Sequence, residues 1–417
     1  MLNKDNIREL AYVVTIDEIK PIAGKDRVEC AMVGGWSVMV RKDQFKPGDP
    51  AVYFEIDSKC PEKEPFTFLA AKHYRIKTQK YKTSDGYFFS QGLLMSARDL
   101  DWIKAPHPRV GIIDDDAKLH EVGNESRFLT KKLGITYASD NDNRRKAPSK
   151  DKYKSMAQRH GKLFSHQPYR WLMKRDWGKK LLFLFYGKKR DKRSAWPYWI
   201  PKTDEERIEN LPHLFEDKSP WIVTEKIDGT STTFAMEKKL FGRYKFYVCS
   251  RNVVFDKPDK KCFYETNVYT EMAEKYNIEE VLKTFLKNNR HLNRVILQGE
   301  TYGAGIQKND YGMKDRDIKI FNLITDEKKY ENKWNSTNRW SSIIMKHELE
   351  ETYNIPCISI LDTEYILPDT IDELRAFVDS EPSKINGEMK EGIVFRSPDG
   401  TRSFKCVSPN YLAKYHG

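Results

Sequence analysis

The octapeptide TEKIDGTS, residues 224–231, places Lys226 two residues before Asp228 and three before Gly229. Given average residue usage, a Lys-x-Asp-Gly match arises by chance in about one chain in ten of this length. The stretch alone therefore leaves two interpretations of Lys226, a solvated surface charge or a nucleophile. Residues elsewhere in the chain distinguish between these two interpretations of Lys226.

Five further charged or aromatic residues follow Lys226, each within or at the end of a strand-like run. They are Arg251 in CSRN, Glu300 in LQGETYG, Phe321 in IKIFNLI, Glu391 in KEGIVFRS and Lys405 in RSFKCV. Each one taken singly could be an ordinary surface charge or a core ring. Together, in this order, they favour side chains that converge on one site.

Changes of pattern divide the chain into three parts. Residues 1–135 are rich in strand-like runs separated by Gly and Pro turns, such as RVECAMVGGWSVMVRK, which predicts two strands around Gly34-Gly35. Residues 196–417 alternate strand-like runs with helical ones such as IEEVLKTFLKNN and TIDELRAFVDS. We therefore predict an α+β fold in which an N-terminal OB-like β-barrel precedes a larger C-terminal α+β domain.

The part between them, residues 136–195, holds most of the positive charge. Arg144 to Arg193 contains 18 Lys and Arg and three acidic residues, a balance of +15, whereas the whole chain carries +12, which leaves −3 for the rest. A concentrated basic stretch is typical of a nucleic-acid partner, but a solvated linker would have the same composition. Trp171 and the run from Leu181 to Phe185 could also dock on a neighbouring domain.

Composition places the chain among soluble intracellular proteins. The longest apolar run, Leu181 to Tyr186, is too short to cross a bilayer, and the N-terminus MLNKDNIREL is charged where a signal peptide would be apolar. The six cysteines are scattered and include no Cys-x-x-Cys pair, which favours reduced thiols over a disulfide framework or a zinc site. We expect a cytoplasmic protein with no membrane partner.

In their order and approximate spacing, Lys226 and the residues that follow it resemble the covalent nucleotidyltransferases, which include polynucleotide ligases and messenger-RNA capping enzymes. The resemblance covers the chain from about Trp196 to the C-terminus. It implies a ligase-type adenylyltransferase domain in which Lys226 attacks the α-phosphorus of a nucleoside triphosphate and Phe321 stacks on the base.

The chemistry explains why these residue types are needed. A nucleophilic lysine must be a neutral amine, yet the pKa of a free lysine is ~10.4. We expect nearby cations, such as Arg251, Lys405 or a metal ion, together with partial burial, to lower that pKa. Mg²⁺ or Mn²⁺ prefers oxygen ligands, and Asp228, Glu300 and Glu391 would supply them.

Two features of the sequence indicate which members of this superfamily the chain resembles. Only 12 residues follow Lys405, which leaves no room for the C-terminal OB domain of DNA ligases and capping enzymes. The stretch from AYVVTIDEIKPI to PAVYFEID instead resembles the N-terminal OB module of RNA ligases of the Deinococcus and Naegleria type. That family also has a Lys-Thr-Asp-Glu-x-Arg stretch, found here in PKTDEERIENL, and its arginine corresponds to Arg207.

The resemblance implies an ATP-dependent RNA ligase that joins a 3′-OH to a 5′-phosphate, at nicks in duplex RNA or RNA/DNA hybrids, and acts as a monomer. It implies three sets of site residues. The catalytic residues are Lys226, Asp228 and Lys405; the cofactor contacts are Arg207, Glu225, Lys226, Arg251, Glu300, Phe321, Glu391 and Lys405; the metal ligands are Asp228, Glu300 and Glu391.

The sequence also departs from the superfamily pattern. Ser403 and Val407 stand where a second lysine of the last motif is common, so that a cation such as Lys414 would have to replace it. Ser231 stands where some RNA ligases have Asn. Two rival functions remain: a capping-type enzyme that uses GTP, and a non-enzymatic RNA-binding protein that would not need Lys226.

Overall fold

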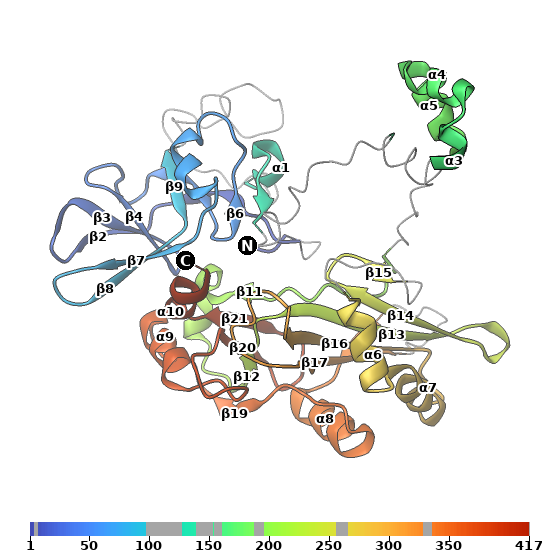
Figure 1. Cartoon of the computed structure of the whole chain (residues 1–417). Coiled ribbons are helices and arrows are strands. Elements are labelled where there is room, and N and C mark those ends of the chain that lie inside the picture. Colours follow the sequence, from blue (N-terminus) through green and yellow to red (C-terminus); the bar gives the residue numbers. More distant parts are fainter. Residues whose placement is uncertain are drawn as a thin grey trace. The chain divides into compact units, whose positions relative to one another are not determined.

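The structure is a computed structural model of the 417-residue chain. It describes residues 1–3, 7–96, 127–138, 153, 161–186, 196–255, 266–327 and 336–416. The chain forms two compact units, of which the first combines Met1–Tyr137 with Trp196–Gly417 and the second is Ala138–Ala195. Figure 1 shows the elements of both units.

The N-terminal part of the first unit is built from short antiparallel strands. They are β1 (Ala11–Thr15), β2 (Glu18–Ile22), β3 (Lys25–Val33), β4 (Trp36–Arg41), β5 (Pro50–Phe54), β6 (Ser58–Lys59), β7 (Thr78–Lys82), β8 (Tyr87–Gln91), β9 (Leu93–Ser96) and β10 (Thr136–Tyr137). A 3-10 helix, Thr67–Lys72, and the short helix α1 (Thr130–Leu133) accompany them.

The hairpin predicted around Gly34-Gly35 is confirmed, because β3 and β4 pair up to Val33 opposite Trp36. Gly34 has φ +56°, a conformation that favours glycine at this turn. The described strands form three-stranded sheets, β1-β5-β9 and β2-β3-β4, and smaller pairs rather than one closed barrel. The predicted OB-like domain is confirmed in this open form.

The C-terminal part of the first unit contains two antiparallel-rich sheets. The five-stranded sheet has the order β11 (Glu206–Arg207), β21 (Ser403–Val407), β20 (Gly392–Arg396), β12 (Trp221–Lys226) and β19 (Ile360–Tyr365). The six-stranded sheet has the order β15 (Val254–Phe255), β14 (Tyr244–Ser250), β13 (Thr230–Lys238), β16 (Arg294–Gly303), β17 (Arg316–Glu327) and β18 (Ser336–Arg339). The chain passes directly from one sheet to the other between β12 and β13.

Three helices form where helical runs were predicted: α6 (Val268–Lys275), α7 (Ile278–Asn288) and α9 (Ile371–Ser380). The helices α8 (Ser342–His347) and α10 (Pro409–Tyr411) were not predicted. In α7 the buried residues Ile278, Leu282, Phe285 and Leu286 share one face, as helical spacing requires. Thr370 begins α9 with a capping box.

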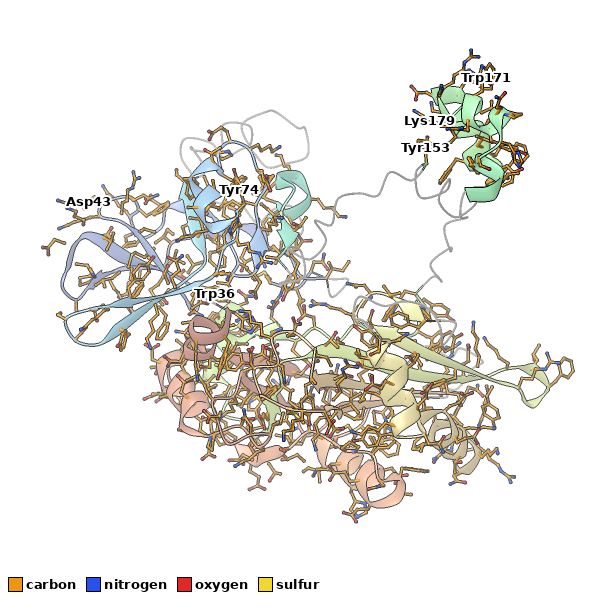
Figure 2. The ribbon with its side chains drawn as sticks, in the orientation of Figure 1. Trp36, Asp43, Tyr74, Tyr153, Trp171 and Lys179 are labelled. Carbon is orange, nitrogen blue, oxygen red and sulfur yellow. The ribbon has the colours of Figure 1, made fainter. Side chains whose placement is uncertain are left out.

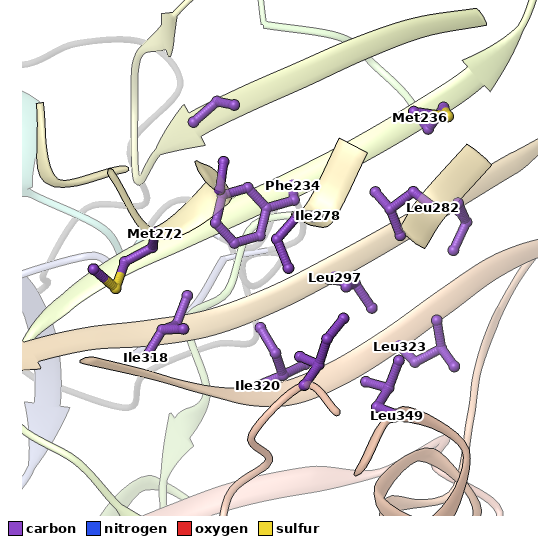
Figure 3. Packing of buried hydrophobic residues seen from close by; sticks show 14 of the residues in the cluster. Phe234, Met236, Met272, Ile278, Leu282, Leu297, Ile318, Ile320, Leu323 and Leu349 are labelled. Carbon is purple, nitrogen blue, oxygen red and sulfur yellow. The ribbon is translucent and has the colours of Figure 1, made fainter. Parts of the chain in front are cut away.

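The largest core lies between the six-stranded sheet and its helices. Figure 3 shows Phe234, Leu297 and Leu323 of the sheet facing Ile278 and Leu282 of α7, all of them buried. A second core, which contains Trp221 and Phe395, covers the five-stranded sheet beneath α9. Two well-packed sheets thus hold the segment that joins them, residues 227–229.

The N-terminal strands contact the C-terminal part of the same unit directly. The indole N–H of Trp36 donates to the Oδ1 of Asn210 at 2.8 Å, and the N–H of Gly35 donates to the carbonyl of Glu209 at 2.8 Å. A Cβ on Gly35 would lie 2.7 Å from the Cα of Glu209, so only glycine permits this approach. Residues 209–210 follow β11, which belongs to the sheet of Lys226.

The described part of the second unit is a helical segment, Gly161–Tyr186, which we call the helical unit. It contains α3 (Gly161–Phe164), α4 (Gln167–Met173) and α5 (Asp176–Tyr186), whose core includes Phe164 and Leu182. A Cβ on Gly178 would lie 2.2 Å from the carbonyl of Leu172, so this glycine allows α5 to approach α4. Of the apolar residues expected to dock, Leu182 is buried here, whereas Trp171 is half exposed (49%). Figure 2 shows the side chains of this unit, with Trp171 and Lys179 labelled.

Among the described residues, no helix is long and apolar enough to cross a membrane. The cation-rich run from Lys188 to Arg193 and most of Arg144–Lys154 lie outside the described residues. The division into domains at residues 135 and 195 stays a prediction.

Candidate active site

Lys226 lies at the end of β12, beside the strand that begins after Glu391. The register pairs Lys226 with Gly392, the first residue of β20. The Nζ of Lys226 donates to the Oε2 of Glu391 at 2.6 Å, and the two side chains are 23% and 13% exposed. This contact joins two residues, 165 positions apart, that the sequence predicted to meet.

Gly229 is required by the crossing between the two sheets. A Cβ on this residue would lie 2.4 Å from the carbonyl oxygen of Thr301 and 3.0 Å from the Cγ of Glu300. The position therefore accepts only glycine, and the close approach brings Glu300 of β16 next to the Lys-Ile-Asp-Gly turn. The N–H of Asp228 donates to the hydroxyl of Tyr311 at 2.8 Å, which fixes the turn further.

The charges around Lys226 raise its pKa instead of lowering it. Burial acts to lower the pKa of Lys226, but Glu391, Glu300 and Asp228 together outweigh burial. Without a metal ion, the pKa of Lys226 is therefore shifted in the direction opposite to the expected one, because three carboxylates surround the amine. The same crowding and burial raise the pKa of Glu300 to about 8.

The predicted metal ligands Asp228, Glu300 and Glu391 all act on Lys226, but among the described residues their ligand atoms do not all lie within 4.8 Å of one another, so they suit a hydrated divalent cation better than a tight cage. Burial raises the pKa of Glu391 as well, although Lys226 opposes the rise. The raised pKa values of Glu300 and Glu391 show that burial and the neighbouring carboxylates disfavour the charged form of both groups. A bound Mg²⁺ or Mn²⁺ would supply the missing positive charge through oxygen ligands.

A second group of charges, which we call the basic edge, gathers around Asp204. Its carboxylate accepts hydrogen bonds from Lys405 at 2.8 Å and from Arg251 at 2.7 Å, and the Nε of Arg8 lies 3.7 Å away. Burial, followed by repulsion from Arg8, lowers the pKa of Lys405 to about 8. In the parallel pairing of β11 with β21, the backbone of Arg207 lies opposite that of Lys405.

Two arginines of the basic edge have donors to spare. Among the described residues, Nε and Nη2 of Arg8 and Nε and Nη1 of Arg207 are buried with no hydrogen-bond partner. Buried guanidinium groups are normally satisfied, so these orphaned donors fit an anionic ligand such as a triphosphate. The basic edge therefore suits the phosphates of a nucleotide.

Phe321 and Glu225 were both predicted to contact the cofactor, and the structure gives them different surroundings. Phe321, on β17, is partly buried and packs against the apolar cluster of Ile227, Tyr302, Tyr311 and Ile358. The guanidinium carbon of Arg396 lies 5.8 Å from the centre of its ring, and the stacking of Phe321 on a base stays a prediction. The carboxylate of Glu225 instead accepts hydrogen bonds from the hydroxyl of Ser383 and the N–H of Lys384, and so it holds the segment before β20.

The replacement for the second lysine of the last motif is not Lys414. That side chain is exposed and lies over the ring of Tyr415, with Nζ 4.7 Å from its centre. The cations whose charge acts on Lys405 are Arg8, Arg207 and Lys226. Ser231, the other departure, shares a hydrogen bond with the hydroxyl of Thr203 at 2.8 Å.

Sequence reasoning missed four residues of this region: Arg8, Asp204, Asp310 and His416. Asp204 could have been found, because it belongs to the PKTDEER stretch that was singled out for Arg207. Arg8, Asp310 and His416 come from an N-terminal segment, a loop and the C-terminal segment, none of which carries a periodic pattern. The Nε2 of His416 lies 3.2 Å from the Oδ2 of Asp228.

A half-buried lysine at the junction of two sheets, with carboxylates around it and a basic edge beside it, is the arrangement expected from the resemblance to ligase-type nucleotidyltransferases. Residues 219–416 match the RNA ligase family, and residues 10–96 match an OB-fold domain family. These matches follow the predicted order, in which an OB-fold domain precedes an RNA-ligase-like domain. No curated protein matches the chain.

Solved structures of the RNA ligase of Naegleria gruberi are similar over almost the whole chain. The one with pyrophosphate is 26% identical, with 98% of this chain and 99% of that chain covered and a TM-score of 0.66. A variant with ATP and Mn is 25% identical, with 98% of each chain covered and a TM-score of 0.66. A variant with AMP and Mn is 25% identical, with 98% and 99% covered and a TM-score of 0.66. The cofactors predicted from the sequence, ATP and a divalent metal ion, are those of these relatives.

Proposed function

We propose that the chain is an ATP-dependent RNA ligase that joins a 3′-OH to a 5′-phosphate through AMP bound covalently to Lys226. The observation that carries the proposal is the contact of Lys226 with Glu391 inside an RNA ligase domain. The relatives solved with ATP, AMP or pyrophosphate support ATP as the nucleotide.

In the first step, the Nζ of Lys226 forms a bond to the α-phosphorus of ATP and pyrophosphate leaves. The lysine must first lose a proton, and the Oε2 of Glu391, at 2.6 Å, is within reach to accept it. A divalent cation at the three carboxylates would offset their charge, lower the pKa of Lys226 and stabilise the charge that builds on the phosphate.

The basic edge would bind the leaving pyrophosphate. Lys405 and Arg251 now share the carboxylate of Asp204, and Arg8 and Arg207 have buried donors without partners. Phosphate oxygens would take the orphaned donors and compete with Asp204 for the other two cations. Pyrophosphate departure then restores the Asp204 contacts.

In the two later steps, AMP moves from Lys226 to a 5′-phosphate, and a 3′-OH displaces AMP to form the phosphodiester. We propose nicks in duplex RNA or RNA/DNA hybrids as the substrate, with a monomer acting in the cytoplasm. An OB-fold domain and a basic segment in the same chain support a polynucleotide substrate.

The experiment is to incubate the purified chain with α-labelled ATP or α-labelled GTP and a divalent metal, and to look for label on the protein. We expect label from ATP alone. Label from GTP alone would favour a capping-type enzyme, and no label from either would favour an RNA-binding protein without catalysis. Labelled protein is then offered nicked duplexes that differ only in RNA or DNA on each side of the nick.

A further inference from the structure

We propose that Asp228, Asp310 and His416 form a binding site for a divalent transition-metal ion, which shares Asp228 with the predicted set of Glu300 and Glu391 but takes its other two ligands from different segments. One ligand atom from each of the three residues lies within 4.8 Å of the others. The Nε2 of His416 is 3.2 Å from the Oδ2 of Asp228 and 3.8 Å from the Oδ2 of Asp310. The inference does not depend on the ligase reaction.

The three ligands come from separate segments that are tied together. Asp228 belongs to the turn between β12 and β13, Asp310 to the loop between β16 and β17, and His416 to the C-terminal segment. The side-chain amide of Gln307 donates to the carbonyl of Gly229 at 2.9 Å, which holds the loop against the turn. Lys308 donates to the carbonyl of Tyr415, which holds the C-terminal segment against the loop. The site is therefore assembled before any ion arrives.

A second observation points to a ligand at this place. The side chain of Asp310 is only 7% exposed, and its Oδ2 accepts no hydrogen bond from a fixed donor among the described residues, although the carboxyl groups of Asp310 and Asp228 are close enough to share a proton. Leaving a buried carboxylate oxygen without a donor costs free energy, so such an atom calls for a partner. A metal ion between Asp310, Asp228 and His416 would be that partner.

The donor set predicts which ions bind. Two carboxylates and one imidazole suit Mn²⁺ or Zn²⁺, whereas Mg²⁺ prefers a shell of oxygen atoms. The set of Asp228, Glu300 and Glu391 offers oxygen alone. Three protein ligands also leave coordination positions for water or a phosphate oxygen, while the hydroxyl of Tyr411, 3.3 Å from the Oδ2 of Asp228, can orient that carboxylate.

The test measures Mn²⁺ binding to the full chain without nucleotide, by the loss of the EPR signal of free Mn²⁺. We expect one bound Mn²⁺ whose echo-modulation spectrum shows coupling to a nitrogen nucleus. Zn²⁺ should displace it, and an excess of Mg²⁺ should not. Absence of Mn²⁺ binding, or a bound ion without nitrogen coupling, would overturn the proposal.

Matched variants separate this site from the other carboxylates. His416→Ala and Asp310→Asn should each weaken Mn²⁺ binding by about tenfold or more, and the nitrogen coupling should vanish in His416→Ala. His416→Asp should keep the ion but let Mg²⁺ compete, because all the ligands are then oxygens. The variants His347→Ala and Asp315→Asn change exposed residues, serve as controls and should bind Mn²⁺ as the parent does.

If Glu300→Gln removes the Mn²⁺ that is bound without nucleotide while His416→Ala retains it, the ion belongs to the other set of carboxylates and the inference fails. His416 is near the chain end and outside the cores, so its variants should fold.

Discussion

Lysine and arginine gather at two places in this molecule, and their surroundings differ. In the site around Lys226 the cations are mostly buried and lie beside carboxylates, as Lys226 does with Glu391 and Lys405 with Asp204. In the helical unit, residues 163–186 contain five cations and one acidic residue, Asp176, which pairs with Lys179. Arg170, Lys174 and Lys180 are exposed.

This difference in burial and pairing determines how strongly the replacement of a single cation should affect activity. Burial and close charges give Lys226 and Lys405 pKa shifts of opposite sign, so each has properties that no other lysine can replace. Exposed cations of the helical unit are screened by water and salt, and any of them can be replaced by a neighbour. We therefore expect large effects from single changes in the site and small, additive effects in the helical unit.

The largest effect should come from Lys226→Ala. Removing the amine that contacts Glu391 should abolish labelling by α-labelled ATP, which is measured on the denatured protein. The variant should still seal a nick that already carries a 5′-adenylate, because that step needs no lysine nucleophile. The exposed Lys314→Ala is the control and should label fully. Labelling of Lys226→Ala at the parent's rate would refute a covalent role.

Glu300→Ala and Glu391→Ala should each slow labelling about a hundredfold or more, the usual loss for a metal or electrostatic contact in catalysis. Both carboxylates raise the pKa of Lys226 in the metal-free protein, so each variant should also lower that pKa. The measurement is the labelling rate against pH and Mn²⁺ concentration. Full activity of both variants would put the metal elsewhere, whereas the exposed Glu388→Ala should change nothing.

Lys405 should give a pH dependence of the reverse reaction, in which pyrophosphate removes AMP from labelled protein. Its pKa is lowered to about 8, so its charge is complete below that pH and is lost above it. Pyrophosphorolysis should therefore decline above about pH 8, by at most about tenfold per pH unit. Lys405→Arg keeps the charge and should remove this decline. Asp204 raises the pKa of Lys405, so Asp204→Asn should move the decline to lower pH. An identical profile in all three proteins would exclude Lys405 as its origin.

Phe321→Leu should have a milder effect, since it removes stacking but no charge. An aromatic contact contributes about 0.5–1.5 kcal/mol, which corresponds to a rise of about twofold to tenfold in the ATP concentration needed for half-maximal labelling. The maximal rate should change little. Because Phe321 also packs against the apolar cluster that contains Ile227, thermal unfolding is the control: a lower unfolding temperature without a change in ATP requirement would make the ring part of the core.

The sequence predicted the strands and helices that carry the site, because continuous apolar runs mark the buried strands β16 and β20 and a helical apolar spacing marks α7 and α9. It also predicted that Lys226, Glu300 and Glu391 would meet, since each lies at or beside the edge of a strand-like run. Arg8 and His416 could not be predicted, because they lie in segments without a period and reach the site only through tertiary contacts. The sign of the pKa shift of Lys226 depends on distances to three carboxylates, and no sequence pattern contains those distances.

The smallest effects should come from the helical unit, where the question is whether its exposed cations hold the phosphate backbone. A variant with Arg170, Lys174 and Lys180 changed to Gln should label with ATP as the parent does, because the small substrate does not need them. It should bind a nicked duplex more weakly, and the log-log slope of affinity against salt should fall by about one unit for each phosphate contact removed. The matched control changes three exposed cations of the other unit, Arg243, Lys287 and Arg290, to Gln, which lowers the net charge equally. If the helical variant and the control variant lose the same affinity for the duplex, the loss depends on net charge and not on where the cations lie. If the helical variant also loses labelling, the unit supports the fold of the catalytic domain. Replacing cations in the two regions would then impair the same activity to different extents.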